Sequence, residues 1–522
     1  MTSDPVRREG PDAIIGRVML AFEGFTMPAA VEARLRRAPA AGVTLFRPYN
    51  VESPGQVRAL TSALHEAAGG GLLIAADQEG GQFIALGDGS TPFAGNMALG
   101  AVDDVGLTER VGQAIGTEAR AMGVNVVYAP VLDIASNPVN PALGIRAFSD
   151  DAALVGRHGA AMVRGLQSAG VAAAIKHFPG AGDAATDPHH GVVSVSASRA
   201  VLDSRELAPF REAVAAGARL AMSGHIALPA VTGRDDVPST LSRAVMTDLL
   251  RGALGFDGVS ITDALDMAGV AGRDGVPDVA AAIEAGVDLL LTAADPVGRE
   301  RIERALVDAA GGFDPDEMAA TERRVGALRS WLASFGPQPD IDVVGCADHQ
   351  ALAAELAARS ITLVRDPAGL VPVDWSSVRR VLAVMPQPSD LTPADTSSTV
   401  RAALAIALRR YHPDVDEVVV EPEPDAASIA AVRSRAETAD LAVIGTIDAH
   451  RLRAQLDLVE AVVATGAPTI AVAMRGPWDV AAYPAGATAL ATYSILPGPL
   501  DAFAAVLAGE AQAPGRLPVS VP

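Results

Sequence analysis

The sequence predicts an α/β fold in which an N-terminal (β/α)8 TIM-type barrel is followed by a smaller α/β sandwich domain. Short apolar, β-branched runs alternate with amphipathic helical stretches over roughly the first 300 residues, as parallel strands covered on both faces require. Eight such units favour a closed barrel, and an open doubly wound sheet is the alternative. A second α/β pattern begins after a proline-containing segment near residue 335.

Eight apolar runs are the expected barrel strands. Several follow a glycine that indicates a turn, among them Gly42, Gly170 and Gly258. In chain order the expected strands are Val18–Phe22, Val43–Phe46, Leu72–Ala76, Val126–Ala129, Val171–Ile175, Leu220–Met222, Val259–Thr262 and Val287–Leu291.

The expected barrel domain covers residues 1–334, a linker covers 335–345 and the sandwich domain covers 346–522. Phe335–Asp342 contains two prolines after a long helical run, which is typical of a linker. Beyond it we expect a helix over Gln350–Arg359. The strands expected to follow are Ile361–Val364, Val381–Met385, Val418–Val420, Leu441–Ile444, Ile470–Ala473 and Leu490–Tyr493.

Composition excludes several classes of function. The chain has 522 residues and a net charge of −21, which argues against a nucleic-acid partner because phosphate contacts need basic patches. The one cysteine, Cys346, excludes an intrachain disulfide and a cysteine metal cluster. No apolar stretch approaches the roughly 20 residues of a membrane span. The polar start, and Arg17 within the apolar run Ala13–Phe22, lead us to expect a cytoplasmic protein without a signal peptide.

Charged and polar residues stand where a barrel places its active site, at the C-terminal ends of the strands. These residues are Arg47, Asp77, Asp133, Lys176, His177, His225 and Asp263. A set of ordinary solvated loops would also be polar, but would place fewer charges directly after buried strands.

The segment from Lys176 to His190 is the richest in chemistry. It holds the only lysine of the chain, Lys176, and three of the nine histidines. Asp187 and His189 are separated by one proline, so the carboxylate can hold the imidazole in one tautomer and raise its basicity. The adjacent His190 could take the same role, and spacing alone does not choose between them.

Two further segments carry carboxylates. Asp263 ends a buried strand, where a carboxylate needs hydrogen bonds or a cation, although an aspartate that caps a helix is an equally good interpretation. Asp77-Gln-Glu-Gly-Gly81 is by itself typical of a polar turn, but at a strand end it is a candidate for binding sugar hydroxyls.

Taken together, these segments resemble glycoside hydrolase family 3, in particular its two-domain β-N-acetylhexosaminidase branch. The resemblance covers nearly the whole chain, and its most specific part is the Lys-His-Phe-Pro-Gly loop followed by Asp-x-His. The motifs that carry it include Asp77–Gly81, Pro130–Asp133, Gly144–Ser149, Lys176–Gly180, Asp187–His189, Leu207–Phe210, Leu241–Arg243, Leu254–Gly258, Thr262–Met267 and Gly515–Val519.

The resemblance implies a retaining mechanism through a covalent glycosyl-enzyme. It places the nucleophile on Asp263 and the general acid/base on His189, paired with Asp187. Residues of the sugar pocket fall on Asp77, Arg146, Lys176 and His177. The implied substrate is a non-reducing β-linked N-acetylglucosamine, as in cell-wall fragments, which implies a role in peptidoglycan turnover.

Four positions depart from the branch pattern: Gln82, Ala85, Ala181 and Pro188. The relatives have arginine at the first two, so bidentate donors are lost near the expected pocket. We therefore consider altered sugar specificity with the chemistry retained.

Two rival functions remain. A glycoside phosphorylase is compatible with a histidine acid, because a neutral imidazole repels phosphate less than a carboxylate does. A non-catalytic sugar-binding homologue would explain the four departures, but not the retention of nucleophile and acid together. His177, His189, His190 and Asp183 include no tight helical pair of histidines and no cysteine joins them, so we expect no metal and no cofactor. The expected partner is a small carbohydrate substrate, and the oligomeric state is left open.

Overall fold

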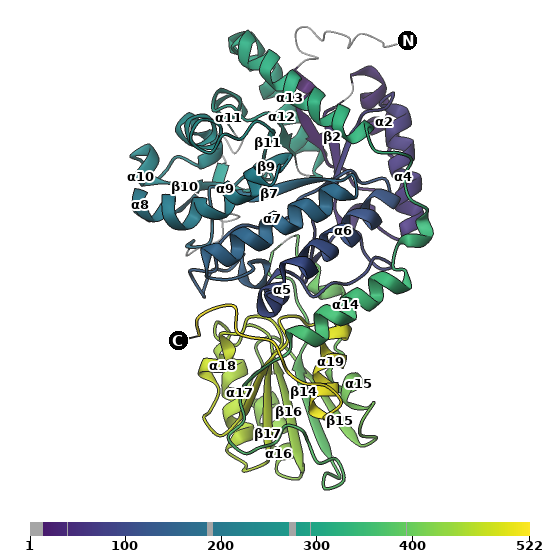
Figure 1. Ribbon diagram of the computed structural model, residues 1–522, viewed down its shortest axis with the longest axis vertical. Helices are drawn as coiled ribbons and strands as arrows, with labels where there is room; N and C mark the ends of the chain where they lie inside the picture. Colours follow the sequence, from purple (N-terminus) through teal and green to yellow (C-terminus); the bar gives the residue numbers. More distant parts are fainter. Residues whose placement is uncertain are drawn as a thin grey trace.

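The structure is a computed structural model, and it describes residues 14–38, 40–184, 192–270, 278–292, 294–392 and 394–521. The molecule has two parts stacked along its long axis: a barrel with surrounding helices, and a second α/β layer structure below it (Figure 1). The predicted fold class is thereby confirmed.

Eight parallel strands form the barrel in the order β11-β9-β7-β6-β3-β2-β1-β12, so strands that follow one another along the chain are neighbours. The ring closes between β11 and β12, the two ends of this order: the Thr262 N–H of β11 donates to the carbonyl of Leu289, just before β12, at 3.0 Å. All eight predicted strands are confirmed. Their bounds are β1 Val18–Leu20, β2 Gly42–Leu45, β3 Leu73–Ala76, β6 Val126–Val127, β7 Ala172–Phe178, β9 Leu220–Ser223, β11 Val259–Thr262 and β12 Leu290–Leu291.

Helices surround the barrel because the strands are apolar on both faces and need cover outside as well as inside. Helix starts are marked by local chemistry: Ser53 caps α4 by accepting from the Gln56 N–H, and Asp151 caps α7. The α-helices bounded within the described residues of this part are α2 Ala29–Arg37, α3 Arg47–Asn50, α4 Pro54–Ala67, α5 Asn96–Val102, α6 Val105–Ala121, α7 Ala152–Ser168, α8 Arg199–Val201, α9 Leu207–Ala215, α10 Pro229–Thr232, α11 Val279–Glu284, α12 Pro296–Ala309 and α13 Pro315–Ala333.

The second part is built on a six-stranded sheet of order β13-β18-β17-β16-β14-β15, parallel except for β13. All six predicted strands are present: β13 Thr362–Arg365, β14 Val381–Pro386, β15 Val415–Val420, β16 Leu441–Thr446, β17 Thr469–Ala473 and β18 Thr488–Ala491. The predicted helix Gln350–Arg359 lies within α14. The helices are α14 Ala347–Ser360, α15 Leu404–Leu408, α16 Ala426–Ala436, α17 Arg453–Val463, α18 Asp479–Ala482 and α19 Pro497–Leu507.

A buried carboxylate ties the connecting segment to the barrel. Glu118, on α6, accepts hydrogen bonds from the Gly345 N–H at 3.0 Å and from His349 Nδ1 at 2.7 Å, and also from both donors of Thr91. The segment therefore packs on the barrel rather than spanning open solvent. The limits 335–345 for a linker stay a prediction.

Between β3 and β6 lies a small hairpin, β4 (Gln78–Gly80) and β5 (Phe83–Ile84), at the mouth of the barrel. The sequence indicated only a polar turn here. Gly80 and Gly81 have φ of +84° and +63°, a left-handed conformation that glycine adopts without strain, and each packs against Gly95. The hairpin holds the acidic segment after Asp77 against the strand ends. Over the described ranges, no helix is long and apolar enough to cross a membrane.

Candidate active site

The barrel mouth contains a cavity of about 670 Å3. Of the seven predicted site residues, the five that the structure describes all line it: Asp77, Arg146, Lys176, His177 and Asp263. Asp77, His177 and Asp263 come from the C-terminal ends of β3, β7 and β11, as a barrel active site requires. Asp187 and His189 lie outside the described residues.

Lys176 is buried, with 1 % of its surface exposed. Its ammonium lies 2.6 Å from Asp77 Oδ1 and 2.6 Å from Glu79 Oε1. Burial lowers the pKa of Lys176, but the charges of these two carboxylates outweigh it and leave the pKa above its usual value. The lysine is therefore a fixed cation that holds Asp77 in place, and not a proton donor.

Glu79 links Lys176 to Arg146. The guanidinium binds Glu79 in a bidentate pair, with Nε at 3.0 Å and Nη2 at 2.8 Å, and lies 4.1 Å from the centre of the Phe83 ring. Burial raises the pKa of Glu79, but the two cations outweigh it and lower the pKa to about 2. The sequence analysis did not place Glu79 among the site residues. The signal was its position in the Asp77–Gly81 motif.

His177 is held on both sides. Its Nδ1 lies 2.6 Å from Asp133 Oδ2, and its Nε2 lies 3.3 Å from Arg146 Nη2. Because a carboxylate only accepts and a guanidinium only donates, this pairing puts the proton on Nδ1. Asp133 also accepts from the Ala181 N–H at 2.7 Å. Asp133 is a second residue missed as a site residue, although it was noted at a strand end.

Asp263 stands directly after β11, and its Oδ1 accepts from the Ala264 N–H at 2.7 Å. Burial raises the pKa of Asp263, but His177, His225, the Ala264 N–H and Lys176 outweigh it, so the pKa is lowered. His225 faces a hydroxyl, Thr240 Oγ1, at 2.8 Å and the Ala264 carbonyl at 3.0 Å. Asp263 is thus an ionised carboxylate at the wall of the cavity.

The departures from the family pattern lie in different surroundings. The Gln82 amide donates to Asp395 of the second part at 3.0 Å, and Ala85 is packed in the core. Neither is among the described residues that line the main cavity. Ala181 lines a smaller adjoining cavity with Asp133 and His177. Thr392, from the second part, lines the main one.

Glu206 is a buried carboxyl that packs against Gly180, just after β7. Its Oε1 lies 2.5 Å from Arg205, whereas its Oε2 has no hydrogen-bond partner among the described atoms. Burial raises the pKa of Glu206 to about 7, against the opposing charge of Arg205. The folded state therefore holds a proton that the unfolded state releases at lower pH.

We expect the contribution of Glu206 to the free energy of unfolding to fall by about 3 kcal/mol as pH rises from about 4.5 to above 7, because each pKa unit corresponds to about 1.36 kcal/mol. In Glu206→Gln this loss should disappear, since glutamine stays neutral and can still accept from Arg205. Urea unfolding at pH 5 and pH 8.5 measures it. Parallel pH profiles for the two proteins would contradict the role given to Glu206.

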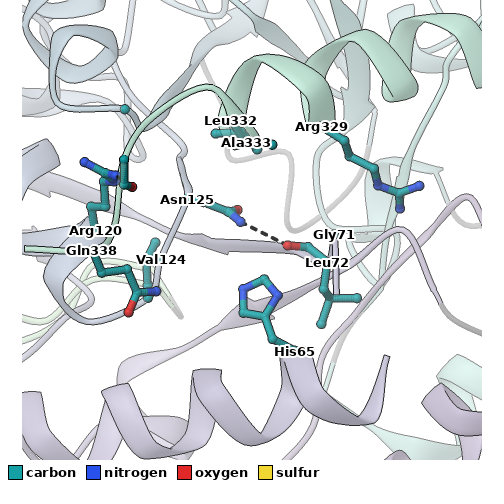
Figure 2. Close-up of a pocket in the computed structure, with 13 residues that line it drawn as sticks. His65, Gly71, Leu72, Arg120, Val124, Asn125, Arg329, Leu332, Ala333 and Gln338 are labelled. Carbon is teal, nitrogen blue, oxygen red and sulfur yellow. Dashed lines mark hydrogen bonds between the residues drawn. The ribbon is translucent and has the colours of Figure 1, made fainter. Parts of the chain in front are cut away.

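A second cavity, of about 240 Å3, lies at the opposite end of the barrel, beside residues that directly precede strands, such as Leu72 before β3 and Asn125 before β6. Figure 2 shows residues that line it. His65 points into it, and the Asn125 amide donates across it to the Leu72 carbonyl at 3.0 Å. Barrel active sites lie at the other end, so this cavity is not part of the candidate site. No group of three or more potential metal ligands occurs in the part of the chain that the structure describes.

Comparison with known proteins shows which family the chain resembles over its whole length. Residues 18–325 match the model of the glycosyl hydrolase family 3 N-terminal domain. "Beta-hexosaminidase A" of Pseudoalteromonas piscicida is 31% identical, over 95% of this chain and 92% of that protein. A solved glycoside hydrolase family 3 β-N-acetylglucosaminidase from Paenibacillus sp. str. FPU-7 is 34% identical with a TM-score of 0.92, and the match covers 98% of each chain.

A "Beta-N-acetylglucosaminidase/beta-glucosidase" of Cellulomonas fimi is 35% identical, over 62% of this chain and 60% of that protein. The barrel, its acidic and cationic mouth and these similarities define a β-glycoside hydrolase. The chain belongs to glycosyl hydrolase family 3, as its sequence predicted.

Proposed function

We propose that the protein is a retaining β-N-acetylglucosaminidase that releases non-reducing β-linked N-acetylglucosamine from small glycosides or cell-wall fragments. The observation that carries the proposal is Asp263: an ionised carboxylate in the wall of a cavity that also holds Lys176, Arg146 and Asp77. The relatives named β-hexosaminidase and β-N-acetylglucosaminidase support the choice of sugar.

The proposed reaction has two steps. In the first, an Asp263 oxygen attacks the anomeric carbon, the bond to the aglycone oxygen breaks, and that oxygen takes a proton from His189. In the second, His189 takes a proton from water, and the water oxygen displaces Asp263 from the anomeric carbon. The role of Asp187 is to orient the imidazole.

The charged side chains of the cavity wall would position the sugar. Asp77 lines the cavity while its Oδ1 is held by Lys176, so its carboxylate is oriented to accept from sugar hydroxyls. Arg146 and His177 stand beside it in one hydrogen-bonded chain with Glu79 and Asp133. Because these side chains are already bound to one another before the substrate arrives, they need little reorganisation on binding.

A mechanism-based label tests the proposal. A 5-fluoro derivative of N-acetylglucosaminyl fluoride should accumulate as a covalent adduct, and peptide mapping should place it on Asp263. Unlabelled protein should hydrolyse a chromogenic β-N-acetylglucosaminide with retention at the anomeric centre. Adduct on another residue, inversion, or sugar 1-phosphate as the main product in phosphate buffer would each refute it. Faster turnover of the β-glucoside would refute the choice of sugar.

A further inference from the structure

His450 of the second part reaches across to the barrel. Its Nδ1 donates to Asp479 Oδ1 at 2.7 Å, and its backbone N–H donates to the same oxygen at 2.8 Å. Its Nε2 donates to the Pro138 carbonyl, in the loop after β6, at 3.0 Å. Asp479 is fully buried, and its other oxygen accepts from Thr446 at 2.5 Å. The imidazole is therefore fixed by its own domain and aimed at the barrel.

Both ring nitrogens of His450 face acceptors, a carboxylate and a carbonyl. Burial lowers the pKa of His450, but the hydrogen bond and charge of Asp479, the charge of Asp448 and the Pro138 carbonyl outweigh it and raise the pKa. A doubly protonated ring satisfies both acceptors at once, whereas either neutral tautomer would leave one nitrogen lone pair against an oxygen. The Pro138 contact is thus a charge-assisted hydrogen bond.

The two asparagines that flank Pro138 extend this contact toward the active site. Asn137 Nδ2 donates to the Ala184 carbonyl at 3.0 Å. Asn140, which is 5 % exposed, donates to the carbonyls of Ala181 at 2.9 Å and Gly182 at 3.1 Å. The loop that His450 holds therefore carries the donors that hold residues 181–184.

Residues 181–184 are held from the barrel side as well. The Ala181 N–H donates to Asp133, the partner of His177. Gly182 packs so closely on the loop after β6 that a Cβ there would lie 1.7 Å from the Ile134 carbonyl oxygen. The segment has little freedom to shift unless the loop around Pro138 shifts with it. Along the chain it is followed by Asp187 and His189.

We propose that His450 is a positioning residue. Through Pro138, Asn137 and Asn140 it fixes residues 181–184, which are the anchor of the chain segment that leads to the proton donor of the reaction. This rests on the proposed function, in which His189 is that donor. The second domain would thereby influence proton transfer, although the proposed acid, His189, belongs to the barrel domain. Displacement of a general acid by a fraction of an ångström is costly because proton transfer needs close hydrogen-bond geometry.

Leaving-group dependence tests the proposal, with kcat/KM measured for two substrates. N,N′-diacetylchitobiose has a sugar hydroxyl as leaving group and needs protonation, whereas the 2,4-dinitrophenyl β-N-acetylglucosaminide does not. We expect His450→Ala to lower kcat/KM about 30-fold for the first and less than about 3-fold for the second. The larger loss is a part of the roughly 10²–10⁴-fold that general acid catalysis supplies. His450→Gln, which keeps a donor for Pro138, should recover part of the loss.

His412 offers a matched control. It is a buried histidine of the same domain beside a tryptophan, Trp375, and its ring nitrogens face the carbonyls of Asp414 and Val378 in that domain. We expect His412→Ala to leave the ratio of the two kcat/KM values unchanged. Asn140→Ala should reproduce the selective loss from the barrel side, which tests the path even if His450→Ala fails to fold.

His189→Ala separates this inference from the function on which it rests. One outcome would overturn the positioning role alone. In it, His189→Ala loses kcat/KM mainly on N,N′-diacetylchitobiose, whereas His450→Ala and Asn140→Ala lose equally on both substrates. Equal losses on both substrates in His189→Ala would overturn the proposed acid, and the positioning role with it. A selective loss in His412→Ala equal to that of His450→Ala would also overturn the positioning role.

Discussion

Asp263→Ala is expected to lower kcat on a chromogenic β-N-acetylglucosaminide by roughly 10⁴-fold or more, the order of loss that follows removal of a covalent nucleophile. The physical reason is that alanine has no oxygen to form the glycosyl ester, and the neighbouring carboxylates Asp77 and Glu79 are both bound to Lys176. Steady-state kinetics with added azide completes the measurement, because azide should rescue turnover and give the α-glycosyl azide.

Asp257 provides the matched control for this variant. It is an exposed aspartate that precedes β11, at the opposite end of the strand that carries Asp263. Asp257→Ala should retain the kcat of the parent. Thermal unfolding of both variants checks that the barrel is intact. If Asp263→Ala keeps more than about a tenth of the parent activity with an unchanged unfolding temperature, Asp263 is not the nucleophile.

The strands were predictable because each is an almost continuous apolar run, and burial on both faces of a parallel barrel demands such runs. Val259–Thr262 was predicted to the residue. Asp77, Lys176, His177 and Asp263 were then predictable from strand ends alone, because in a parallel barrel all C-terminal ends open at one mouth. Arg146 depended on the family resemblance, since it belongs to a short 3-10 turn far from any strand end.

Glu79, Asp133 and Gln82 show where sequence reasoning stops. Glu79 is positioned by a hairpin whose two strands are so short that their residue pattern does not differ from that of a turn. Asp133 takes its role from His177, which is 44 positions away along the chain. Gln82 meets Asp395 of the other domain, at a sequence separation of 313. Partners so distant are fixed by tertiary packing, and neither spacing nor periodicity encodes them.

Glu79→Ala is expected to lower the free energy of unfolding by about 3–5 kcal/mol, the range measured when one member of a buried ion pair is removed. The Glu79 side chain is 2 % exposed and is the shared partner of two cations, Arg146 and Lys176. Without it, both cations stay buried: Lys176 keeps its pair with Asp77, and Arg146 loses the carboxylate that binds it directly. Urea unfolding at pH 7 measures the change.

The same variant should also lower kcat/KM, because Arg146 also contacts His177 and Lys176 holds Asp77. Glu109→Ala is the control for stability: it removes an ion pair with Arg164 whose side chains are 44 % and 45 % exposed, so water and salt screen it, and the loss should stay below about 1 kcal/mol. A loss in Glu79→Ala as small as that of Glu109→Ala would contradict the role of Glu79. It would mean that the remaining carboxylates balance both cations and that the carboxylate shared between them is not what orients the sugar-binding groups.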